Sequence, residues 1–473
     1  MKILLIQPDY FRQAEGPGQL ESRLLPSYSL ILLAEIMERA GHQTRVLDSW
    51  ANWVITGKGV ENNLETGLKA ILAKEQFDLI GISIDTAARK EAIGLAKIAR
   101  ELNPSAKIVA GGPHPTRFWS ALLTEYRDLI DFAFLGGADE SLPALVAHLS
   151  GAGGSLDTIA GIAYRNELGE AVATSKPMFN LNLEKQPALN FKSYFSSLDG
   201  ARPNRAYMVS TRGCKYFCNF CSQVWKKALF HPVARVVEEA RILIEDHGVS
   251  ELVFYDDCLG LSGKHSADIF MAIAGFKSKA RLTGVSHIQL LNPLWLNAFK
   301  EAGGSALMLG IESGTLKLRR KMNKYIEDKE LCMGVELVRK MGLKLGIYTM
   351  IGYPTEEINV VNYTRRLFEK ISPEQVIATV YDLKPGDIMI EWGLKGLMIQ
   401  ESDFFNLDRR FINYMSESEL EEAVGMADYF ETKFTSQELL KDHDPAWWLL
   451  GMDSAKRESL RLKAEENLAK CQR

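Results

Sequence analysis

Short apolar runs alternate with amphipathic segments in the first part of the chain. The run KILLIQ (2–7) is apolar almost without interruption, which is typical of a parallel strand buried on both faces. The segment 26–42 then repeats apolar residues at helical spacing and ends beside Gly41, a favoured residue at helix C-termini. The alternation continues with strands predicted at 44–48, 77–84, 107–112 and 131–137 and helices near 60–75, 88–102 and 116–126. This pattern predicts an α/β domain with a doubly wound parallel sheet over residues 1–150.

A second series of alternating strands and helices follows a short connection. Residues 151–200 contain the turn signal GAGGS (151–155) and a predicted β-hairpin at 159–174, so we expect a linker there. Strands are then predicted at 206–211, 251–257, 281–287, 306–313, 343–352 and 375–383, with helices near 232–247, 263–277, 293–302, 328–341 and 358–371. Six such units predict a partial (β/α)6 barrel of the TIM type over 201–385, with its active site at the carboxyl ends of the strands. Helical spacing continues in 386–473, where we expect a helical C-terminal region.

Composition restricts the class of protein. Of the 473 residues, 46% are hydrophobic and 25% charged, as in globular proteins with a large core. The net charge of -4 argues against a general nucleic-acid binder, whose domains are usually strongly basic. The six cysteines are sparse and unevenly spaced, which favours a reducing compartment over a disulfide framework. No apolar run is long enough to span a bilayer and the first residues do not resemble a signal peptide, so we expect a soluble cytoplasmic protein, with contact at a membrane surface left open.

Three of the cysteines form a compact motif in the stretch TRGCKYFCNFCSQ (211–223). Cys214, Cys218 and Cys221 follow the spacing CxxxCxxC at the end of the first predicted barrel strand. Thiolates bind soft metals and iron–sulfur clusters. A structural zinc ion needs four protein ligands, whereas three cysteines on a four-iron cluster leave one iron open to a substrate. A zinc loop completed by a distant His or Cys is the alternative interpretation.

With this motif the chain resembles the radical SAM enzymes. The resemblance implies a 4Fe-4S cluster held by the three cysteines, and S-adenosyl-L-methionine (SAM) chelated at the open iron and cleaved to a 5′-deoxyadenosyl radical. It also implies an external electron donor such as flavodoxin or ferredoxin. Phe220, the aromatic residue before the third cysteine, fits the family pattern and would border the adenine. On periodicity alone, a core aromatic residue fits this position equally well.

Three further strand ends match motifs of the same family. The second barrel strand ends in Asp256 and Asp257, which the resemblance places against the amino group of SAM; helix capping by Asp257 is the alternative. The fourth strand ends in the motif GIESG, where Glu312 and Ser313 would contact SAM, although Ser313 could instead cap the next helix. The fifth strand ends at Gly352, in a G-x-P segment that would line the adenine.

Glycine-rich loops end the strands of the first domain. They are GGPHPT (111–116) and GGADES (136–141), and neither fits the dinucleotide fingerprint GxGxxG. Because the cysteine motif follows, they resemble the loops of the cobalamin-binding domain that precedes the barrel in one large radical SAM subfamily. The resemblance implies a Rossmann-like cobalamin-binding domain with contacts from Ser83, Gly111, Gly112, His114, Gly136, Gly137 and Glu140. A degenerate domain without a cofactor is the alternative.

The chain has no DxHxxG motif, in which other cobalamin proteins carry the histidine that binds cobalt. The resemblance therefore implies cobalamin with its own base displaced and with no histidine on cobalt. A turn residue hydrogen-bonded to backbone is the simpler interpretation of His114.

Other polar and aromatic residues near the predicted rim are weaker candidates. His287 and Gln289 follow the third barrel strand and could contact substrate or SAM, whereas Cys258 is more typical of a buried small side chain. The run KPGD (384–387) resembles the end of the barrel in relatives. Aromatic residues between Phe404 and Met415 and the pair Trp447-Trp448 would dock the C-terminal region or line a substrate opening.

Together these features resemble a cobalamin-dependent radical SAM methyltransferase. In that subfamily one SAM molecule methylates cobalamin and a second generates the radical that abstracts hydrogen from an unactivated carbon. The substrate we expect is a small molecule, such as a lipid, a hopanoid-like skeleton or a natural-product precursor. Ring closure or rearrangement with the same cofactors is the first alternative, and a non-catalytic metal-binding regulatory protein is the second. No side chain is assigned a catalytic role.

Overall fold

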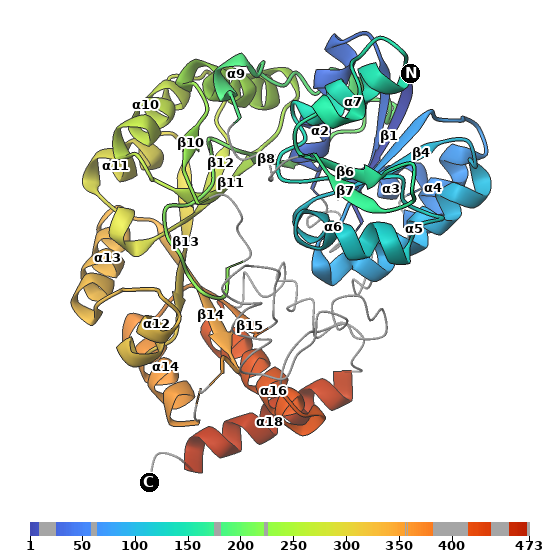
Figure 1. Ribbon diagram of the computed structural model, residues 1–473. Helices are drawn as coiled ribbons and strands as arrows, with labels where there is room; N and C mark the ends of the chain where they lie inside the picture. Colours follow the sequence, from blue (N-terminus) through green and yellow to red (C-terminus); the bar gives the residue numbers. More distant parts are fainter. Residues whose placement is uncertain are drawn as a thin grey trace.

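The computed structural model describes residues 1–8, 25–57, 64–174, 181–221, 226–354, 356, 358–381, 415–436 and 454–470 of the chain. These residues form two α/β domains, coloured blue to teal and green to orange in Figure 1, followed by two helices in red. The predicted fold class is therefore confirmed: a doubly wound domain precedes a partial barrel, and a helical region follows.

The first sheet has seven strands in the order β2-β1-β3-β4-β5-β6-β7. Its parallel strands are β1 (Lys2–Ile6), β2 (Gln43–Leu47), β3 (Leu79–Ser83), β4 (Lys107–Gly111) and β5 (Phe132–Phe134). The helices described beside them are α2 (Tyr28–Arg39), α3 (Ser49–Ile55), α4 (Leu64–Leu72), α5 (Arg89–Leu102), α6 (Pro113–Glu125) and α7 (Ser141–Leu149). Helix α3 was not predicted, because its seven residues are too few to establish a helical period; its start is capped by Asp48.

Side chains of β1 alternate between two cores, one on each face of the sheet. Ile3 and Leu5 belong to a core with α2, α3 and α7, whereas Leu4 and Ile6 belong to a core with α4, α5 and α6. Burial on both faces explains why the sequence of β1 is a continuous apolar run.

The predicted hairpin consists of β6 (Ile162–Arg165) and β7 (Ala171–Ala173), with Gly169 at a φ of 80° in the turn. Strand β6 pairs antiparallel with β5, so the hairpin extends the first sheet. The sequence placed it in the linker because local periodicity shows that a strand exists but not which strand it will pair with.

The described part of the remaining connection, residues 181–204, bonds to the first domain. It includes the short helix α8 (Lys192–Ser196). The Glu35 carboxylate accepts hydrogen bonds from the backbone N–H groups of Asn190 and Phe191 at 2.8 and 2.7 Å, and the Tyr194 hydroxyl donates to Asp48 at 2.8 Å. These hydrogen bonds hold residues 190–194 against α2 and the start of α3, so this part of the connection is not a flexible linker.

The second sheet has six parallel strands in the order β15-β14-β13-β12-β11-β8. They are β8 (Arg205–Met208), β11 (Glu251–Leu259), β12 (Arg281–Ser286), β13 (Gly304–Glu312), β14 (Lys344–Ile351) and β15 (Gln375–Val380). The outer strands β8 and β15 do not pair with each other, so the barrel is open. In Figure 1 the helices α9 (Val233–Arg241), α10 (Gly263–Ala274), α11 (Pro293–Glu301), α12 (Leu316–Lys321), α13 (Asp328–Lys340) and α14 (Ile358–Ile371) lie outside this curved sheet.

Two C-terminal helices, α16 (Glu417–Phe434) and α18 (Ser454–Lys470), pack against each other beside β15 (Figure 1). The Glu431 carboxylate accepts from the Ala378 N–H at 3.0 Å, and the Thr435 hydroxyl accepts from the Val376 N–H at 3.0 Å. Side chains of α16 and of its C-cap thus form hydrogen bonds with backbone N–H groups of β15, which an edge strand would otherwise leave unpaired.

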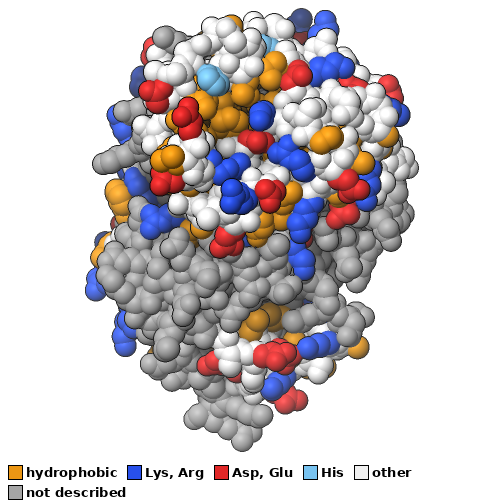
Figure 2. Space-filling view, turned by 45° about the vertical axis from the view of Figure 1, so that its right-hand side comes forward, with side chains coloured by type: hydrophobic (Ala, Val, Ile, Leu, Met, Phe, Trp, Pro, Cys, Tyr) orange, Lys and Arg blue, Asp and Glu red, His pale blue; other side chains and the backbone are white. Residues whose placement is uncertain are grey.

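Charges of both signs are interspersed over the face of the first domain seen in Figure 2, in line with the small net charge of -4. Among the residues that the structure describes, no helix is long and apolar enough to cross a membrane.

Candidate functional site

The cysteine loop begins after β9 (Thr211–Arg212), and β10 (Leu229–Phe230), which follows the loop in the chain, pairs antiparallel with β9. Its far side is docked on the end of α12: the Asn219 side chain donates to the Lys321 carbonyl at 2.8 Å, and the Asn219 N–H donates to the Met322 carbonyl at 2.9 Å. The three cysteines of the motif are each half-buried. The loop is therefore held at β9 and at Asn219, and the thiols of its cysteines stay partly accessible.

The donor set fits an iron–sulfur cluster better than a single ion. Within the described part of the chain, no three His, Cys, Asp or Glu side chains lie close enough to hold one metal ion. Cluster ligands each bind a different iron, so their sulfurs need not meet at one point. The zinc alternative, which needs four ligands around one centre, finds no support among these residues.

Cys258 is buried beside the first cysteine of the motif. A hydrogen bond between the two side chains lowers the pKa of Cys214 to about 7 and raises that of Cys258. Burial raises the pKa of Cys218 to about 11. Cys258 was predicted to be a buried small side chain near the site, and the structure places it so.

Asp256 anchors the start of the cysteine loop. Its buried Oδ1 accepts from the N–H and hydroxyl groups of Ser210, at 3.1 and 2.7 Å, and of Thr211, at 2.5 and 2.6 Å. Burial raises the pKa of this carboxyl group, against the lowering effect of these bonds. The sequence placed Asp256 against SAM, but the structure uses this oxygen to hold the chain that leads to the cysteines. Its Oδ2 is buried without a hydrogen-bond partner.

Asp257 holds the next part of the same loop and faces a cavity. Its Oδ2 accepts from the Gly213 N–H at 2.6 Å. The alternative of helix capping is wrong, because β11 continues to Leu259 and Ser262 caps α10. The two aspartates thus hold neighbouring residues at the start of the loop, Thr211 by Asp256 and Gly213 by Asp257.

A buried ion pair lies at the end of β13. Glu312 has a φ of 65°, and its Oε1 contacts the Lys324 ammonium at 2.7 Å. The ammonium also lies 5.8 Å from the centre of the Phe220 ring. Burial alone would lower the pKa of Lys324, but the carboxylate and the nearby Cys218 outweigh it and raise the pKa. The structure thus brings Glu312, Phe220 and a cluster cysteine together around a cation.

Lys324 was not singled out from the sequence. It follows a run of basic residues in LKLRRKMNK, where a lysine is ordinarily solvated. The available signal was its position twelve residues after Glu312, just beyond the short helix α12, which ends at Lys321.

Ser313 and Gly352 have local structural roles. The Ser313 hydroxyl accepts from the Thr315 N–H at 3.3 Å, while Thr315 itself caps α12. Gly352 has a φ of 78° and its N–H donates to Glu356 at 2.6 Å. The capping alternative for Ser313 is therefore observed in part, because its hydroxyl binds the backbone two residues later, at the N-cap Thr315.

The rim residues after β12 contact the cysteine loop. The His287 ring stacks on Tyr216 with centroids 4.0 Å apart. Burial, with Lys324 and Lys215, lowers the pKa of His287 to about 3, so the ring is neutral. Gln289 donates to the Tyr325 carbonyl at 2.8 Å, which ties the rim to the segment after α12. The predicted segments KPGD, 404–414 and Trp447-Trp448 lie outside the described residues.

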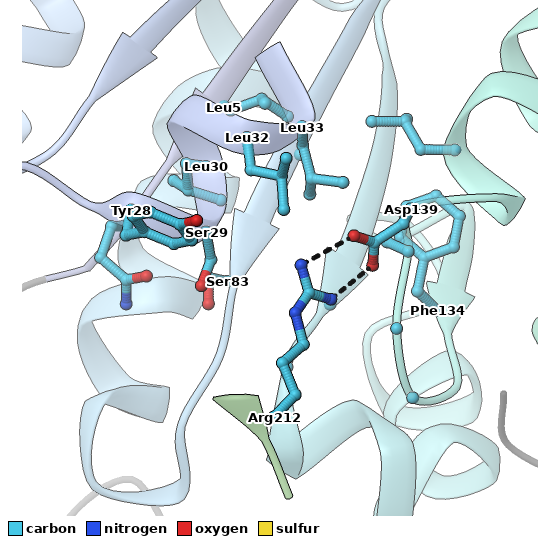
Figure 3. A pocket seen from close by; sticks show the side chains of 18 of the residues that line it. Leu5, Tyr28, Ser29, Leu30, Leu32, Leu33, Ser83, Phe134, Asp139 and Arg212 are labelled. Atoms are coloured by element: carbon cyan, nitrogen blue, oxygen red, sulfur yellow. Dashed lines mark hydrogen bonds and ion pairs between the residues drawn. The ribbon is translucent and has the colours of Figure 1, made fainter. Parts of the chain in front are cut away.

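A cavity of about 1340 Å³, its open mouth included, lies between the two domains. Figure 3 shows it between α2 and the loop after β5, with Arg212 entering from β9. Five of the seven residues predicted to contact cobalamin line it, namely Ser83, Gly111, Gly112, Gly136 and Gly137. The second domain contributes Val209, Thr211, Arg212, Gly213, Tyr255 and Asp257.

The other two predicted contacts lie elsewhere. His114 is buried in the first domain, where its Nδ1 is 3.1 Å from the Thr86 hydroxyl, and burial lowers its pKa to about 3. Glu140 is exposed at the start of α7. The structure thus favours a structural role for His114, whose ring contacts the Thr86 side chain and whose backbone N–H donates to the Ile84 carbonyl at 3.2 Å.

Comparison with known proteins identifies both domains. The family model of the radical SAM superfamily matches residues 208–368, and that of the B12 binding domain matches residues 24–146. The chain is a cobalamin-dependent radical SAM enzyme. Its cofactors are a 4Fe-4S cluster, SAM and cobalamin.

Proteins similar in sequence to this radical SAM enzyme include methyltransferases and cyclases. It is 27% identical over 401 residues to an uncharacterized methyltransferase of Pyrococcus horikoshii, with 83% of each chain covered. It is 24% identical to hopanoid C-3 methylase of Methylococcus capsulatus, covering 73% of this chain and 64% of that protein. It is 23% identical to anaerobic magnesium-protoporphyrin IX monomethyl ester cyclase of Rubrivivax gelatinosus, covering 84% and 70%.

Solved structures share the fold of this radical SAM enzyme. The methyltransferase TsrM from Kitasatospora setae, with cobalamin and a 4Fe-4S cluster bound, matches with a TM-score of 0.66 at 18% identity over 83% of this chain and 78% of that chain. The cobalamin-dependent enzyme OxsB matches with a TM-score of 0.61 at 16% identity over 85% and 56%.

The cavity residues fit cobalamin. At Gly112, which has a φ of 101°, an added Cβ would come within 2.8 Å of the Ile84 carbonyl oxygen, so only glycine fits this turn at the cavity wall. Gly136 also has a positive φ, of 87°. Leu5, Leu33 and Phe134 supply apolar wall around these turns (Figure 3). Such a wall admits a large, partly apolar ligand close to the backbone.

We expect replacement of any one of Cys214, Cys218 or Cys221 by Ala to abolish cluster binding or SAM cleavage, because each supplies one thiolate of the set. Iron and sulfide content after anaerobic reconstitution and 5′-deoxyadenosine formation measure this. Cys332→Ala, on α13, is the matched control and should retain both. Full SAM cleavage by Cys218→Ala would contradict the assignment.

We expect Lys324→Met to destabilise the second domain by about 3–5 kcal/mol, since it leaves a buried carboxylate unpaired. The double variant Lys324→Met/Glu312→Gln should be more stable than the single variant, because no uncompensated charge remains. Thermal unfolding of the apoprotein compares the two. A double variant that unfolds below Lys324→Met would show that the pair is not the source of the loss.

Proposed function

We propose that this enzyme transfers a methyl group to an unactivated carbon of a small molecule, such as a lipid, a hopanoid-like compound or a natural-product precursor. The observation that carries the proposal is the shared cavity, whose wall combines the glycine turns of the B12 domain with the start of the cysteine loop. When bound, cobalamin supplies the methyl group and the cluster with SAM supplies the radical. A carbon in this cavity would be within reach of both cofactors.

The residues around the cluster would hold SAM. Asp257 is the exposed carboxylate beside the cavity and would accept from the ammonium group of SAM. The Lys324 ammonium, already paired with Glu312, would attract the SAM carboxylate, and Phe220 and Gly352 would border the adenine. Glu312 and Ser313 would support this arrangement from the end of β13, and Asp256 would act through the position of the loop.

The residues of the first domain would bind cobalamin with its own base displaced. Ser83 and the glycine turns would contact the corrin edge, and none of the residues described as lining the cavity is a histidine. His114, whose Nδ1 lies 3.1 Å from the Thr86 hydroxyl, would keep this contact and leave cobalt without a histidine. The proposal is therefore that no protein nitrogen binds the metal.

The chemistry also requires a one-electron donor, and we propose an external protein such as flavodoxin or ferredoxin. A reducing compartment, the cytoplasm, suits free thiols that must bind iron. Proposed domain limits are residues 1–150 for cobalamin, 201–385 for radical SAM chemistry and 386–473 for the C-terminal region, with the hairpin of 151–200 added to the first sheet.

Ring closure with the same cofactors is the second candidate function, because cyclases are among the named relatives. Incubation of the reconstituted enzyme with methyl-labelled SAM and a small-molecule extract distinguishes the two. A methyltransferase should release S-adenosylhomocysteine and 5′-deoxyadenosine in nearly equal amounts per labelled product. A cyclase should make deoxyadenosine with no homocysteine product tied to turnover. Cys218→Ala is the control, and it should form neither the labelled product nor 5′-deoxyadenosine.

Electron paramagnetic resonance of the cob(II)alamin form tests the cobalamin proposal. We expect no nitrogen hyperfine splitting, because no histidine is among the described residues that line the cavity and we propose that the base of the cofactor is displaced. His114→Ala should leave the spectrum unchanged. A nitrogen splitting in the native enzyme, whether or not it disappears in His114→Ala, would refute this mode of binding.

A further inference from the structure

We propose that Arg212 and Asp139 form a positioning pair that sets the distance between cobalamin and the cluster. This inference rests on the proposed function, in which one carbon must be reached from both cofactors. Each cofactor is held by a different domain, so some contact between the domains must fix their separation. The pair lies where the cobalamin cavity meets the cysteine loop.

The two side chains meet in a bidentate arrangement. The Arg212 Nη1 donates to Asp139 Oδ2 at 3.0 Å, and Nη2 donates to Oδ1 at 3.0 Å. Figure 3 shows the guanidinium reaching from β9 across the cavity to the carboxylate of the loop after β5. The Arg212 and Asp139 side chains are only 18% and 8% exposed. Two parallel bonds between planar groups fix orientation as well as distance.

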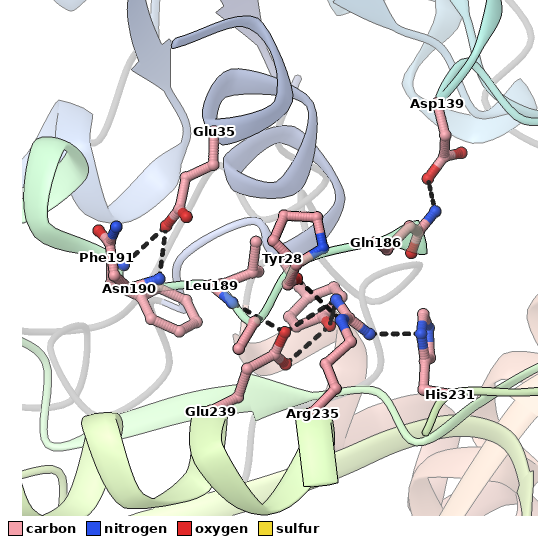
Figure 4. Close-up of polar contacts among 12 residues, drawn as sticks. Tyr28, Glu35, Asp139, Gln186, Leu189, Asn190, Phe191, His231, Arg235 and Glu239 are labelled. Carbon is pink, nitrogen blue, oxygen red and sulfur yellow. Dashed lines mark hydrogen bonds and ion pairs between the residues drawn. The ribbon is translucent and has the colours of Figure 1, made fainter. Parts of the chain in front are cut away.

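Both ends of the pair belong to rigid segments next to a cofactor. Arg212 stands two residues before Cys214, and its neighbours Thr211 and Gly213 are held by the paired aspartates of β11. Asp139 follows the glycine turn that lines the cobalamin cavity, and its Oδ1 also accepts from Gln186 at 2.6 Å (Figure 4). A short path of fixed groups thus runs from the cobalamin turn to the first cluster ligand.

A second contact keeps the domains together independently of this pair. The Tyr28 hydroxyl donates to Glu239 at 3.0 Å and accepts from Arg235 at 3.1 Å, and Arg235 pairs with Glu239 at 2.8 Å (Figure 4). The Glu239 carboxylate also accepts from the Leu189 N–H at 3.0 Å. All of these groups are buried. Loss of the Arg212 pair should therefore change the local separation of the cofactors without releasing one domain from the other.

The distance between cob(II)alamin and the reduced cluster can be followed by electron paramagnetic resonance, because each speeds the spin relaxation of the other. The reconstituted holoenzyme is compared with Arg212→Gln, Asp139→Asn and the charge swap Arg212→Asp/Asp139→Arg. The neighbouring Gln186 is compatible with the swap, since its amide can donate to an Asp side chain at position 139 and accept from an Arg side chain there. Arg241→Gln is the control, because Arg241 bonds only with its own helix and the residues after it on the surface in the contacts described here.

We expect both single variants to bind the two cofactors and to lose relaxation enhancement, and the swap to recover it. Single variants with native enhancement, or a swap that recovers nothing, would overturn the inference. Loss of cofactor in the single variants that the swap does not repair would also overturn it, in favour of a purely structural role. The measurement needs no substrate, so it is independent of whether the native enzyme yields a methylated product.

Discussion

The site depends on one buried carboxylate oxygen, Oδ1 of Asp256. It gathers four donors from Ser210 and Thr211, which fixes the direction in which the chain leaves β8 and enters the cysteine loop. Desolvation makes a buried carboxylate unfavourable unless it is well bonded, so the loop start and the aspartate stabilise each other. The cluster thiols and Arg212 follow this point directly in the chain, where Asp257, Asp139 and the end of α12 hold the next residues.

The buried charges around the cavity are arranged as local pairs. Lys324 with Glu312 lies beside the cluster, Arg212 with Asp139 beside the cobalamin turn, and Arg235 with Glu239 in the docking contact. Buried pairs add little net stability compared with apolar side chains, but the loss of one partner is costly. Such pairs suit a site in which two cofactors must keep a fixed relation, because each tolerates few alternative geometries.

The sequence predicted the parts of the fold that local patterns encode. The strands of both sheets, the open barrel and the cysteine loop follow from apolar runs and spacing, and five of the seven proposed cobalamin contacts line the cavity. Roles that depend on distant partners could not be predicted. The bonds of Asp256 to Ser210 and the ion pair of Lys324 with Glu312 join residues that no local pattern relates, so neither contact could be predicted. His114 and Glu140 belong to the same glycine-rich loops, yet neither is among the residues that line the cavity: His114 is buried against Thr86 and Glu140 is exposed.

The hydrogen bonds from β15 to Glu431 and Thr435 have a consequence for how the chain matures. Ala378 and Glu431 are 53 residues apart, so during synthesis the last strand of the barrel emerges well before the side chain that covers it. Until then its backbone can pair with a strand of another nascent chain. Packing of α16 onto β15 would thus be a late step in folding. A chain that ends before α16 would be a substrate for chaperones and proteases rather than a smaller working enzyme.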